Sequence, residues 1–390
     1  MSLRGKACIV GAYEHPLRKA PGHSVARLHA EVAAGALADA GLTKDDVDGY
    51  FCAGDAPGLG PIDMAEYMNL TRLRHVDATD TGGSSYLLHV SHAAQAIAAG
   101  KCDVALVTLA GRPRSSGTAT GTRPRSWGPD IPNDAYELPY GRTVAAAYAL
   151  VAARHMHEFG TTSEQLAWVK VAASHHAQHN PQAMLPQVVT VEDVVSSPMV
   201  SDPLHRLDCC VISDGGGALV VARPEIARRL NRPVITLRGA GEAVKHQEAG
   251  GIDLTYSAGR RSGAAAFAEA GVSPADIRYA SIYDSFTITV VVQLEDLGFC
   301  EKGRGGAFVA DGNLISGVGR LPLNTDGGGL CNNHPANRGG MTKVIEAVRQ
   351  LRGEAHPAVQ VPGCHLALAH GTGGLLGTRH GSATLILERA

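Results

Sequence analysis

The residues best suited to chemistry stand next to glycine-rich turns. One turn, TGGSS at 81–85, leads into an apolar stretch, and another, DGGGLCNNHP, contains His334. Tyr283 follows the apolar run YASI, and His370 begins the turn HGTGG. Imidazole and phenol groups transfer protons, and backbone N–H groups at a helix start stabilise an oxyanion. On residue type alone, each position is also compatible with a structural role, such as a core tyrosine or a strand-end histidine.

Other polar groups give weaker signals. His175 and His179 have the i, i+4 spacing of zinc ligands, but no HExxH pattern accompanies them. We therefore interpret HHAQH as a solvated helix face and expect no metal site. The segment GDAPGLG at 54–60 is rich in glycine but lacks the Lys-Ser/Thr pair of a phosphate-binding loop.

The eight cysteines stand at positions 8, 52, 102, 209, 210, 300, 331 and 364. None forms a CxxC pair, and the adjacent Cys209 and Cys210 are poorly placed to bridge each other. This usage predicts reduced thiols in a cytoplasmic protein. No cysteine occurs between Cys52 and Cys102, so the first glycine-rich turn carries no thiol.

Length and composition exclude several classes of protein. The 390 residues suffice for two ordinary domains, and 44% apolar with 18% charged residues predicts a large core. A net charge of -2 offers no basic excess for nucleic acid or a membrane surface. We see no membrane-spanning apolar run and no signal-peptide pattern, so neither feature is expected.

The chain repeats itself once. ALADAGLTKDDVD at 36–48 and AFAEAGVSPADIR at 266–278 read alike at an offset of 230 residues. Each reads as a helix end, a glycine stop and a Ser/Thr cap before a short strand. Further pairs follow in the same order, including the two glycine-rich turns. An internal duplication explains these pairs and predicts two halves, 1–230 and 231–390.

The helix expected at 84–99 has an unusual composition. No Asp, Glu, Lys or Arg occurs between Thr81 and Gly100. A helix that is apolar on all sides is buried on all sides, so His89, His92 and Gln95 need hydrogen-bond partners. The pattern predicts a helix layer enclosed between two sheets.

The segment from about 112 to 200 has no counterpart in the second half. It begins with the loop RPRSSGTATGTRPRSWGPD, and helices are expected at 141–159 and 163–179. Thr162 or Ser163, followed by Glu and Gln, marks the start of the second helix. We interpret this insertion as a lid over an active site.

Together these segments resemble the thiolase superfamily, in particular its sterol-carrier-protein-type or lipid-transfer-protein-type branch. GTTSEQLAWVKVAASHHAQHNPQAM resembles that branch's loop-domain helices, and DPLHRLDCCVISDGGGALVV resembles the end of its first half. YDSFTITVVVQLEDLGFC resembles its second-half active-site segment. GGGLCNNHP is similar to GGxxxxGHP, with Asn333 in place of glycine. The resemblance covers essentially the whole chain.

The resemblance implies an α/β thiolase fold, a duplicated five-layer α-β-α-β-α sandwich with an inserted loop domain, usually dimeric. It places the family's nucleophilic cysteine at Gly83 or Ser84, where this chain has no thiol. We interpret the chain as a cysteine-less, aldolase-like member. Ser84 is an alternative nucleophile, but a serine needs an adjacent base, and helix capping is the simpler role.

The resemblance also implies roles for the proton-transfer candidates. His334 matches the GHP histidine, which bonds the thioester or enolate oxygen. Tyr283 begins the segment that reads NEAF or HDCF in the family, and it is expected to donate or accept a proton. His370 stands where the family has a second cysteine, which acts as an acid/base. The expected oxyanion hole consists of backbone N–H groups of Gly83, Ser84 and Gly373.

Two further residues are expected beside this site rather than in it. Asp284 is expected to be a supporting or capping carboxylate. Cys331 occupies, in the second turn, the place of the first-half nucleophile, but the corresponding family position is not catalytic.

Without an acyl-accepting thiol, the expected reaction is carbon–carbon bond cleavage or formation through a CoA enolate. A retro-aldol cleavage of a β-hydroxyacyl-CoA fits best, with no cofactor beyond the coenzyme A of the substrate. The alternatives are an acetyl-CoA acetyltransferase or thiolase-type acyltransferase, and a non-catalytic acyl-CoA or lipid-binding subunit. The expected partners are a second copy of the chain and a small zinc-ribbon/OB-fold protein.

Overall fold

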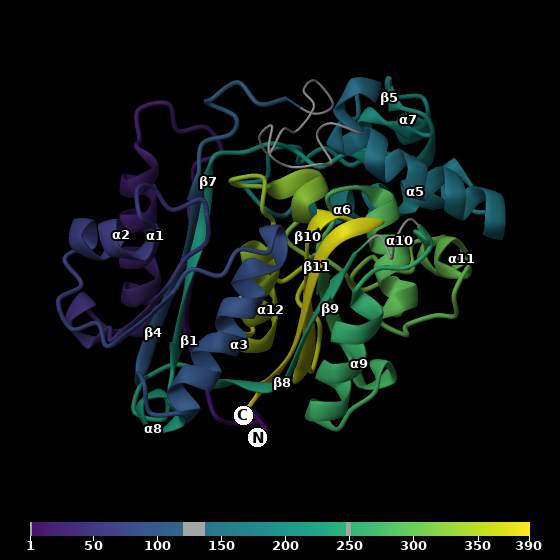
Figure 1. Ribbon diagram of the computed structural model, residues 1–390. Helices are drawn as coiled ribbons and strands as arrows, with labels where there is room; N and C mark the ends of the chain where they lie inside the picture. The colour runs from purple at the N-terminus through teal and green to yellow at the C-terminus, as the bar shows by residue number, and fades with distance from the viewer. Residues whose placement is uncertain (1, 120–136, 247–250) are drawn as a thin grey trace.

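The chain forms five alternating layers of helices and sheets in the computed structural model, which describes residues 2–119, 137–246 and 251–390 (Figure 1). This is the predicted α-β-α-β-α order. Among the described residues, no helix is both long and apolar enough to cross a bilayer.

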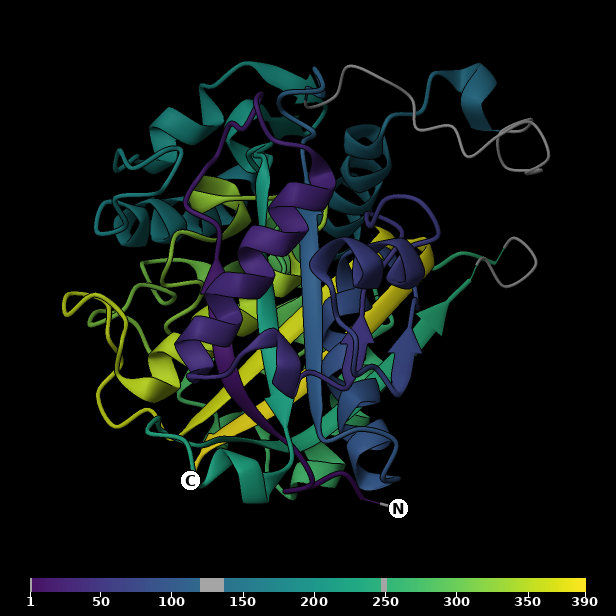
Figure 2. The ribbon, with the colours of Figure 1, turned by 90° about the vertical axis from the view of Figure 1, so that its left-hand side faces the viewer.

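The first outer layer and the first sheet come from the amino-terminal half, and Figure 2 shows the outer helices covering the sheet. The two outer helices, α1 (Val25–Ala40) and α2 (Pro61–Met68), pack through apolar side chains onto the strands behind them. The strands of the first sheet are β1 (Cys8–Glu14), β2 (Gly49–Phe51), β3 (His75–Asp77), β4 (Val104–Gly111) and β7 (Gly215–Ala222).

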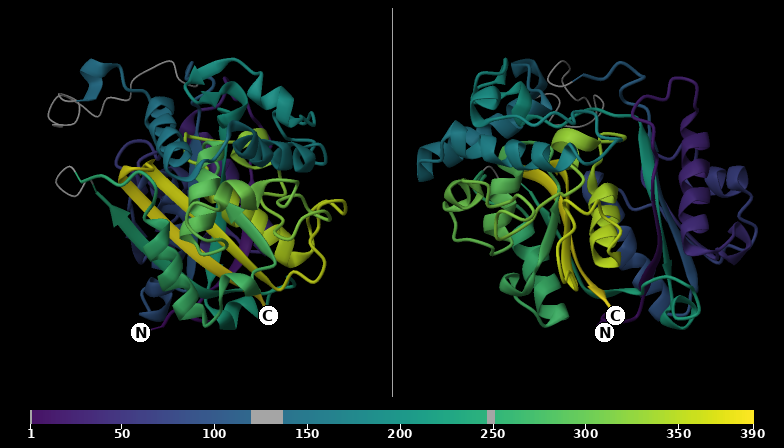
Figure 3. Two further views of the ribbon diagram at one scale, coloured as in Figure 1. Left: turned by 90° about the vertical axis from the view of Figure 1, so that its right-hand side faces the viewer. Right: turned by 180° about the vertical axis from the view of Figure 1, so that it is seen from behind.

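The second sheet and its outer helices come from the carboxy-terminal half, seen from the other side in Figure 3. The short helix α8 (Pro224–Ala227) precedes this half. Its elements are β8 (Ile235–Lys245), α9 (Gly259–Ala270), β9 (Tyr279–Ile282), α10 (Thr287–Asp296), α11 (Gly305–Val309), β10 (Leu366–Leu375) and β11 (Thr378–Arg389).

The two sheets are joined at a narrow seam. The strand order is β3-β2-β4-β7-β1-β8-β11-β10-β9. β1 and β8 pair only at Cys8 with Thr236 and at Ile9 with Ile235. The hydrogen-bonded ladder is thus continuous, while most of each half stands apart and encloses the central layer (Figure 1).

The central layer consists of α3 (Ser85–Ala98) and α12 (Gly340–Arg352). Apolar residues of both helices share one core with both sheets. Two polar residues of α3 find partners as expected: His89 Nε2 lies 2.9 Å from the Thr79 carbonyl, and His92 Nδ1 lies 2.8 Å from Asp77. The buried helix predicted from its lack of charge is confirmed for most of its length, whereas Gln95 and Ala98 near its end are exposed.

The insertion lies at one end of the sandwich, at the top of Figure 1, and both termini lie at the other end. The expected capping box at Thr162 is present, with Gln165 as its partner. Much of the expected loop before the helices falls outside the described residues. The inserted elements are α5 (Val144–Phe159), α6 (Ser163–Ala177), α7 (Val191–Val195), β5 (Met199–Ser201) and β6 (Leu204–His205).

Candidate active site

Tyr283 and His334 form a buried hydrogen-bonded pair. Tyr283 directly follows β9, and its N–H donates to the His370 carbonyl at 3.0 Å, which extends the pairing of β9 with β10. His334 follows the π-turn η7 (Gly328–Asn332). Tyr283 Oη lies 2.7 Å from His334 Nε2, and the rings meet edge to face with centroids 5.4 Å apart. The fold thus joins two expected site residues that are 51 positions apart in sequence.

Burial determines the protonation of this pair. Tyr283 is 5% exposed and His334 is 6% exposed. Burial lowers the pKa of His334 to about 4 and raises the pKa of Tyr283 above its usual range. Both rings are therefore neutral near pH 7, and we assign the phenol O–H as donor to Nε2. Such a pair can carry a proton from a substrate hydroxyl through the phenol to the imidazole.

Gly83 lies against the Tyr283 ring. A Cβ on Gly83 would lie 2.4 Å from Tyr283 Cε2 and 2.4 Å from the Thr372 carbonyl oxygen, so no side chain fits. Gly83 belongs to the turn η2 (Gly82–Ser84), which leads into α3. The first N–H groups of a helix have no intrahelical acceptor. The turn therefore presents backbone donors beside the phenol.

An ion pair clamps this turn to the loop that carries His334. Asp80 accepts the N–H of Gly82 at 2.8 Å and of Gly54 at 3.1 Å. Arg338 binds both Asp80 oxygens, at 2.6 and 2.9 Å. Burial alone would raise the pKa of Asp80, but the Arg338 guanidinium outweighs it and holds that pKa below the usual range. The clamp fixes the two halves of the site relative to each other.

The second glycine-rich turn repeats the cap of the first. Asp326 accepts the Gly328 N–H at 2.9 Å, as Asp80 accepts that of Gly82. The duplicated sequence therefore gives the same local structure twice: a carboxylate that caps the glycine two residues after it, in a turn before the central layer.

The second turn already binds a further carboxylate. The N–H groups of Gly329 and Leu330 donate to Asp284 at 2.8 and 3.2 Å. When the two turns are aligned at their capping carboxylates, these two residues correspond to Gly83 and Ser84. No carboxylate of the described residues bonds the N–H of Gly83 or of Ser84. The second turn thus shows that a turn of this sequence pattern can bind an anion through its backbone N–H groups.

The hydroxyl of Ser84 is committed to its own turn. Ser84 is fully buried, and its Oγ donates to the Thr81 carbonyl at 2.9 Å and lies 2.9 Å from Thr81 Oγ1. No hydrogen bond to a histidine or carboxylate activates it within the described chain. Neither Ser84 nor Ser85 caps a helix N–H in the expected way: Ser85 Oγ donates to the Gly82 carbonyl. These contacts disfavour Ser84 as a nucleophile.

His370 points away from the pair, contrary to its expected acid/base role. Its Nδ1 lies 2.9 Å from Thr384 Oγ1, and its Cε1 would lie 3.3 Å from a Cβ on Gly259, at the start of the outer helix α9. Neighbouring strand residues alternate between faces, and Ala369 belongs to the central core whereas Leu368 belongs to the outer one. His370 lies on the outer face. Burial lowers its pKa to about 3.

Gly373 lies at the site wall. A Cβ there would lie 1.6 Å from the Thr81 carbonyl oxygen, and a Cβ on Gly82 would lie 2.9 Å from the Gly373 Cα. The two backbones therefore touch where β10 passes the first turn. This contact explains the need for glycine at both positions, and the role of Gly373 in an oxyanion hole stays a prediction.

No activated thiol lies at the site. Burial raises the pKa of every cysteine thiol in the chain. A thiolate at Cys210 would raise the pKa of Tyr283, so this cysteine lies near the pair. The backbone N–H of Cys210 donates to the Ser285 carbonyl. Cys331 receives a hydrogen bond from the buried Lys170 at 3.1 Å and faces the insertion rather than the pair. A buried thiol with a raised pKa is a poor nucleophile.

Among the described residues, no group of three or more His, Cys, Asp or Glu side chains is placed to hold a metal ion. His179 instead stacks on His356 with ring centroids 5.0 Å apart.

Two charged residues near the site were not expected from the sequence. Arg338 clamps the first turn through Asp80, and Lys343 forms a buried ion pair with Asp284 at 2.8 Å. The duplication itself was the available signal, because α12 had to be as buried as α3, and its charged residues therefore needed buried partners.

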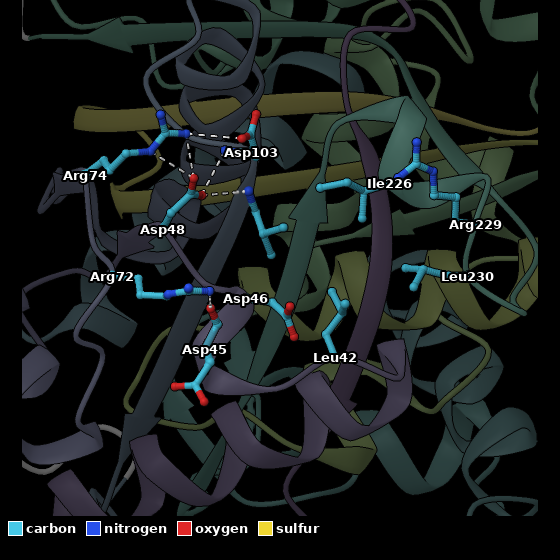
Figure 4. A pocket seen from close by; sticks show the side chains of 11 residues that line it. Leu42, Asp45, Asp46, Asp48, Arg72, Arg74, Asp103, Ile226, Arg229 and Leu230 are labelled. Atoms are coloured by element: carbon cyan, nitrogen blue, oxygen red, sulfur yellow. Dashed lines mark hydrogen bonds and ion pairs between the residues drawn. The ribbon is translucent and has the colours of Figure 1, made fainter.

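A hollow of about 510 Å³ lies at the opposite end of the first sheet (Figure 4). Asp48 and Arg74 line it just before the amino ends of β2 and β3, whereas the glycine turn follows the carboxyl end of β3. Arg74 binds Asp48 at 2.6 Å and Asp103 at 3.3 Å. Arg72 donates to the Asp45 backbone carbonyl at 2.9 Å, and the hollow contains none of the site residues.

Known proteins match the chain over its full length. Residues 241–389 match the family described as thiolase C-terminal domain-like. A steroid side-chain-cleaving aldolase of Thermomonospora curvata is 37% identical, over 95% of this chain and 96% of that protein. A 17-hydroxy-3-oxo-4-pregnene-20-carboxyl-CoA lyase of Mycobacterium tuberculosis is 35% identical, over 95% and 97%. Acetyl-CoA acetyltransferases are also among the relatives.

A solved structure agrees with these relatives. The Ltp2-ChsH2(DUF35) aldolase superposes with a TM-score of 0.89 at 34% identity, over 99% of this chain and 98% of that one. The shared fold, the sequence identity over nearly the whole length and the missing thiol all indicate the same family. The chain belongs to the thiolase superfamily, as an aldolase-like member of its sterol-carrier-protein-type branch without the nucleophilic cysteine.

Proposed function

We propose that the protein cleaves a β-hydroxyacyl-CoA by a retro-aldol reaction. The observation that carries this proposal is the buried Tyr283–His334 hydrogen bond, which lies against a glycine turn that lacks a thiol. The names of two relatives, an aldolase and a carboxyl-CoA lyase, support this class of reaction. No cofactor is proposed beyond the coenzyme A of the substrate.

The reaction balances without an added reagent. Tyr283 accepts the proton of the β-hydroxyl while its own proton passes to His334. The β-carbon becomes a ketone or aldehyde carbonyl, and the electrons of the Cα–Cβ bond move into the thioester to form an enolate. The N–H groups of Gly83 and Ser84 bind the enolate oxygen. The proton then returns through the pair to the α-carbon and releases a shortened acyl-CoA.

An acyltransferase reaction is the second candidate, because acetyl-CoA acetyltransferases are also relatives. That reaction needs a covalent acyl-enzyme. The raised pKa values of the thiols and the internal hydrogen bonds of Ser84 argue against a nucleophile at the first turn. A non-catalytic acyl-CoA-binding subunit is the third candidate, and it predicts binding without turnover.

We propose a steroid side-chain thioester as the first substrate to test. Two relatives, 37% and 35% identical, carry names that refer to steroid side-chain cleavage or to a pregnene carboxyl-CoA. A β-hydroxyl on a ring carbon would yield a ring ketone and a short acyl-CoA. A straight-chain β-hydroxyacyl-CoA serves as the comparison substrate.

A partner protein is part of the proposal. The name of the similar solved aldolase, Ltp2-ChsH2(DUF35), joins two components. We propose that this chain also works with a small zinc-ribbon/OB-fold protein that helps to bind the acyl-CoA. Activity assays therefore need both the chain alone and the chain co-expressed with such a protein.

We also propose a homodimer in the cytoplasm. The strand β3 is a free edge of the sheet, and unpaired edges favour association. Val76 on β3 is 46% exposed, and Leu59 near α2 is 73% exposed. Light scattering after gel filtration tests the dimer, with Val76→Lys as the variant expected to dissociate it. The eight free cysteines fit a reducing compartment.

The decisive experiment mixes the protein, with and without its partner, with a β-hydroxyacyl-CoA and analyses the products by mass spectrometry. The lyase proposal expects a ketone or aldehyde, no requirement for free CoA, and resistance to iodoacetamide. An acyl group covalently attached to the protein would instead favour the acyltransferase. Tight binding without any product, even with the partner, would favour the binding subunit.

A further inference from the structure

We infer that the buried ion pair between Lys343 and Asp284 is a positioning device that sets the proton affinity of His334. The inference rests on the proposed function, because it concerns how the same Tyr283–His334 pair transfers a proton. Lys343 Nζ lies 2.8 Å from Asp284 Oδ1, and each side chain is 1% exposed. A pair buried this deeply loses its hydration, so it needs close geometry and further hydrogen bonds.

Asp284 connects the two residues of the proton-transfer pair. It is the next residue after Tyr283, and its carboxylate accepts the N–H groups of Gly329 and Leu330. Those N–H groups belong to η7, which ends two residues before His334. One carboxylate therefore anchors the backbone on both sides of the Tyr283–His334 hydrogen bond.

The ion pair also lies close to the imidazole. A Cβ on Gly329 would lie 3.0 Å from Asp284 Oδ1 and 3.5 Å from His334 Cδ2, so both groups approach the same glycine. A Cβ on Gly339 would lie 3.0 Å from His334 Cδ2. Lys343 is four residues further along α12, about one helical turn away.

The two charges act on His334 in opposite directions. Burial is the main cause of its lowered pKa, Asp284 raises that pKa, and Lys343 lowers it. With both charges present, each opposes the effect of the other, and the effect of Asp284 is the larger. With one charge removed, the remaining charge acts on the imidazole through a medium of low dielectric constant. Burial therefore keeps His334 neutral, and the ion pair limits how far either charge alone can change its proton affinity.

Other groups also contact or influence the Tyr283–His334 pair. Besides burial, the Gly339 backbone and the side chains of Tyr148, Cys210 and Arg338 act on the pKa of Tyr283. The Ser213 hydroxyl accepts the backbone N–H of His334 at 3.0 Å. Substitutions at positions 284 and 343 leave all of these side chains in place.

The test compares four variants of the full chain: Lys343→Met, Asp284→Asn, the double variant Lys343→Met/Asp284→Asn, and the conservative Lys343→Arg. Histidine-labelled protein is titrated by NMR, with His334→Gln identifying the signal. We expect no titration of His334 above about pH 5 in the wild type. Lys343→Met should raise its pKa by about one unit or more, whereas Asp284→Asn should lower it.

The double variant removes both charges, so its His334 titration should return close to that of the wild type. Lys343→Arg should retain the wild-type titration. In active protein, the acid limb of the kcat profile should follow the NMR shift, while KM changes less. A purely structural ion pair would lower stability towards urea without moving the titration, and that result would overturn the inference.

Asp284→Asn keeps the inference testable if Lys343→Met fails to fold, because it should move the His334 titration in the opposite direction while Asp326 and Glu346 still act on Lys343. An active lyase in which the His334 titration ignores these substitutions would refute the inference and spare the proposed function. The expected titration shifts in a protein that cleaves no β-hydroxyacyl-CoA would refute the function and spare the electrostatic role of the ion pair.

Discussion

The two glycine-rich turns share a sequence pattern but differ in use. Asp80 and Asp326 cap them in the same way. The second turn binds Asp284 from its own chain, whereas the first lies against Tyr283 without such a carboxylate. The duplication thus supplied two turns with the same cap, of which the first is a 3-10 turn and the second a π-turn. One now holds the proton-transfer pair in place with an internal carboxylate, and we propose that the other holds the substrate oxygen.

The largest loss of activity is expected from substitutions of Tyr283 and His334. Tyr283→Phe and His334→Ala should each lower kcat/KM by about 10²–10⁴, because each removes a proton-transfer group. The double variant should lose little more than the worse single variant, since the two act as one unit. Steady-state kinetics with the β-hydroxyacyl-CoA measure these effects. Fully additive losses would indicate that the two residues work separately.

The first turn should not tolerate a side chain at Gly83. Gly83→Ala should lower kcat/KM by about 10²–10³, because its methyl group displaces Tyr283 and disturbs the backbone donors. Gly22→Ala is the matched control, since a Cβ there meets nothing within 4 Å. Near-normal rates in Gly83→Ala would show that the first turn does not contact the substrate.

The Asp80–Arg338 clamp holds the two turns in one site. Arg338→Lys keeps the charge but loses the two-point contact, and we expect a loss of about tenfold in kcat/KM with a folded protein. Arg74→Lys is the control for the loss of an arginine–carboxylate pair, because Arg74 forms its ion pairs in an exposed position at the far end of the sheet. Equal effects of both substitutions would point to general stability.

Acid should destabilise both halves through histidines that are buried and neutral. Their pKa values lie below the unfolded value, so the unfolded state binds more protons and stability falls as pH drops below about 6.5. Each such histidine can cost up to about 1.4 kcal/mol per pH unit. Urea unfolding at pH 7 and pH 5 measures the loss, and His370→Gln should reduce it. The histidines concerned are His89, His176, His334, His370 and His380.

The smallest effect is expected from the serine at the vacant nucleophile position. Ser84→Ala removes hydrogen bonds within the first turn but no activated nucleophile, and it should lower kcat/KM by less than about tenfold. A complete loss of activity, together with loss of a trapped acyl-enzyme, would revive the acyltransferase candidate.

Much of the site could be predicted because it lies in motifs with strong local signals. The glycine turns, Tyr283 and His334 all stand in segments that resemble the family. His370 was misplaced because a family position was transferred without its strand face. Lys343 was missed because a lysine in a helix usually reaches solvent, and only the enclosed position of α12 makes it buried.

The sequence by itself determined the duplication, the charge-free central helix and the absence of a thiol at the first turn, because these depend on residue types and their spacing. Tertiary structure alone decided which groups meet. Tyr283 contacts His334, Asp284 occupies the second turn, and His370 faces the outer layer. These outcomes follow from strand register and layer order, which bring distant backbone segments together and are not encoded in any one segment.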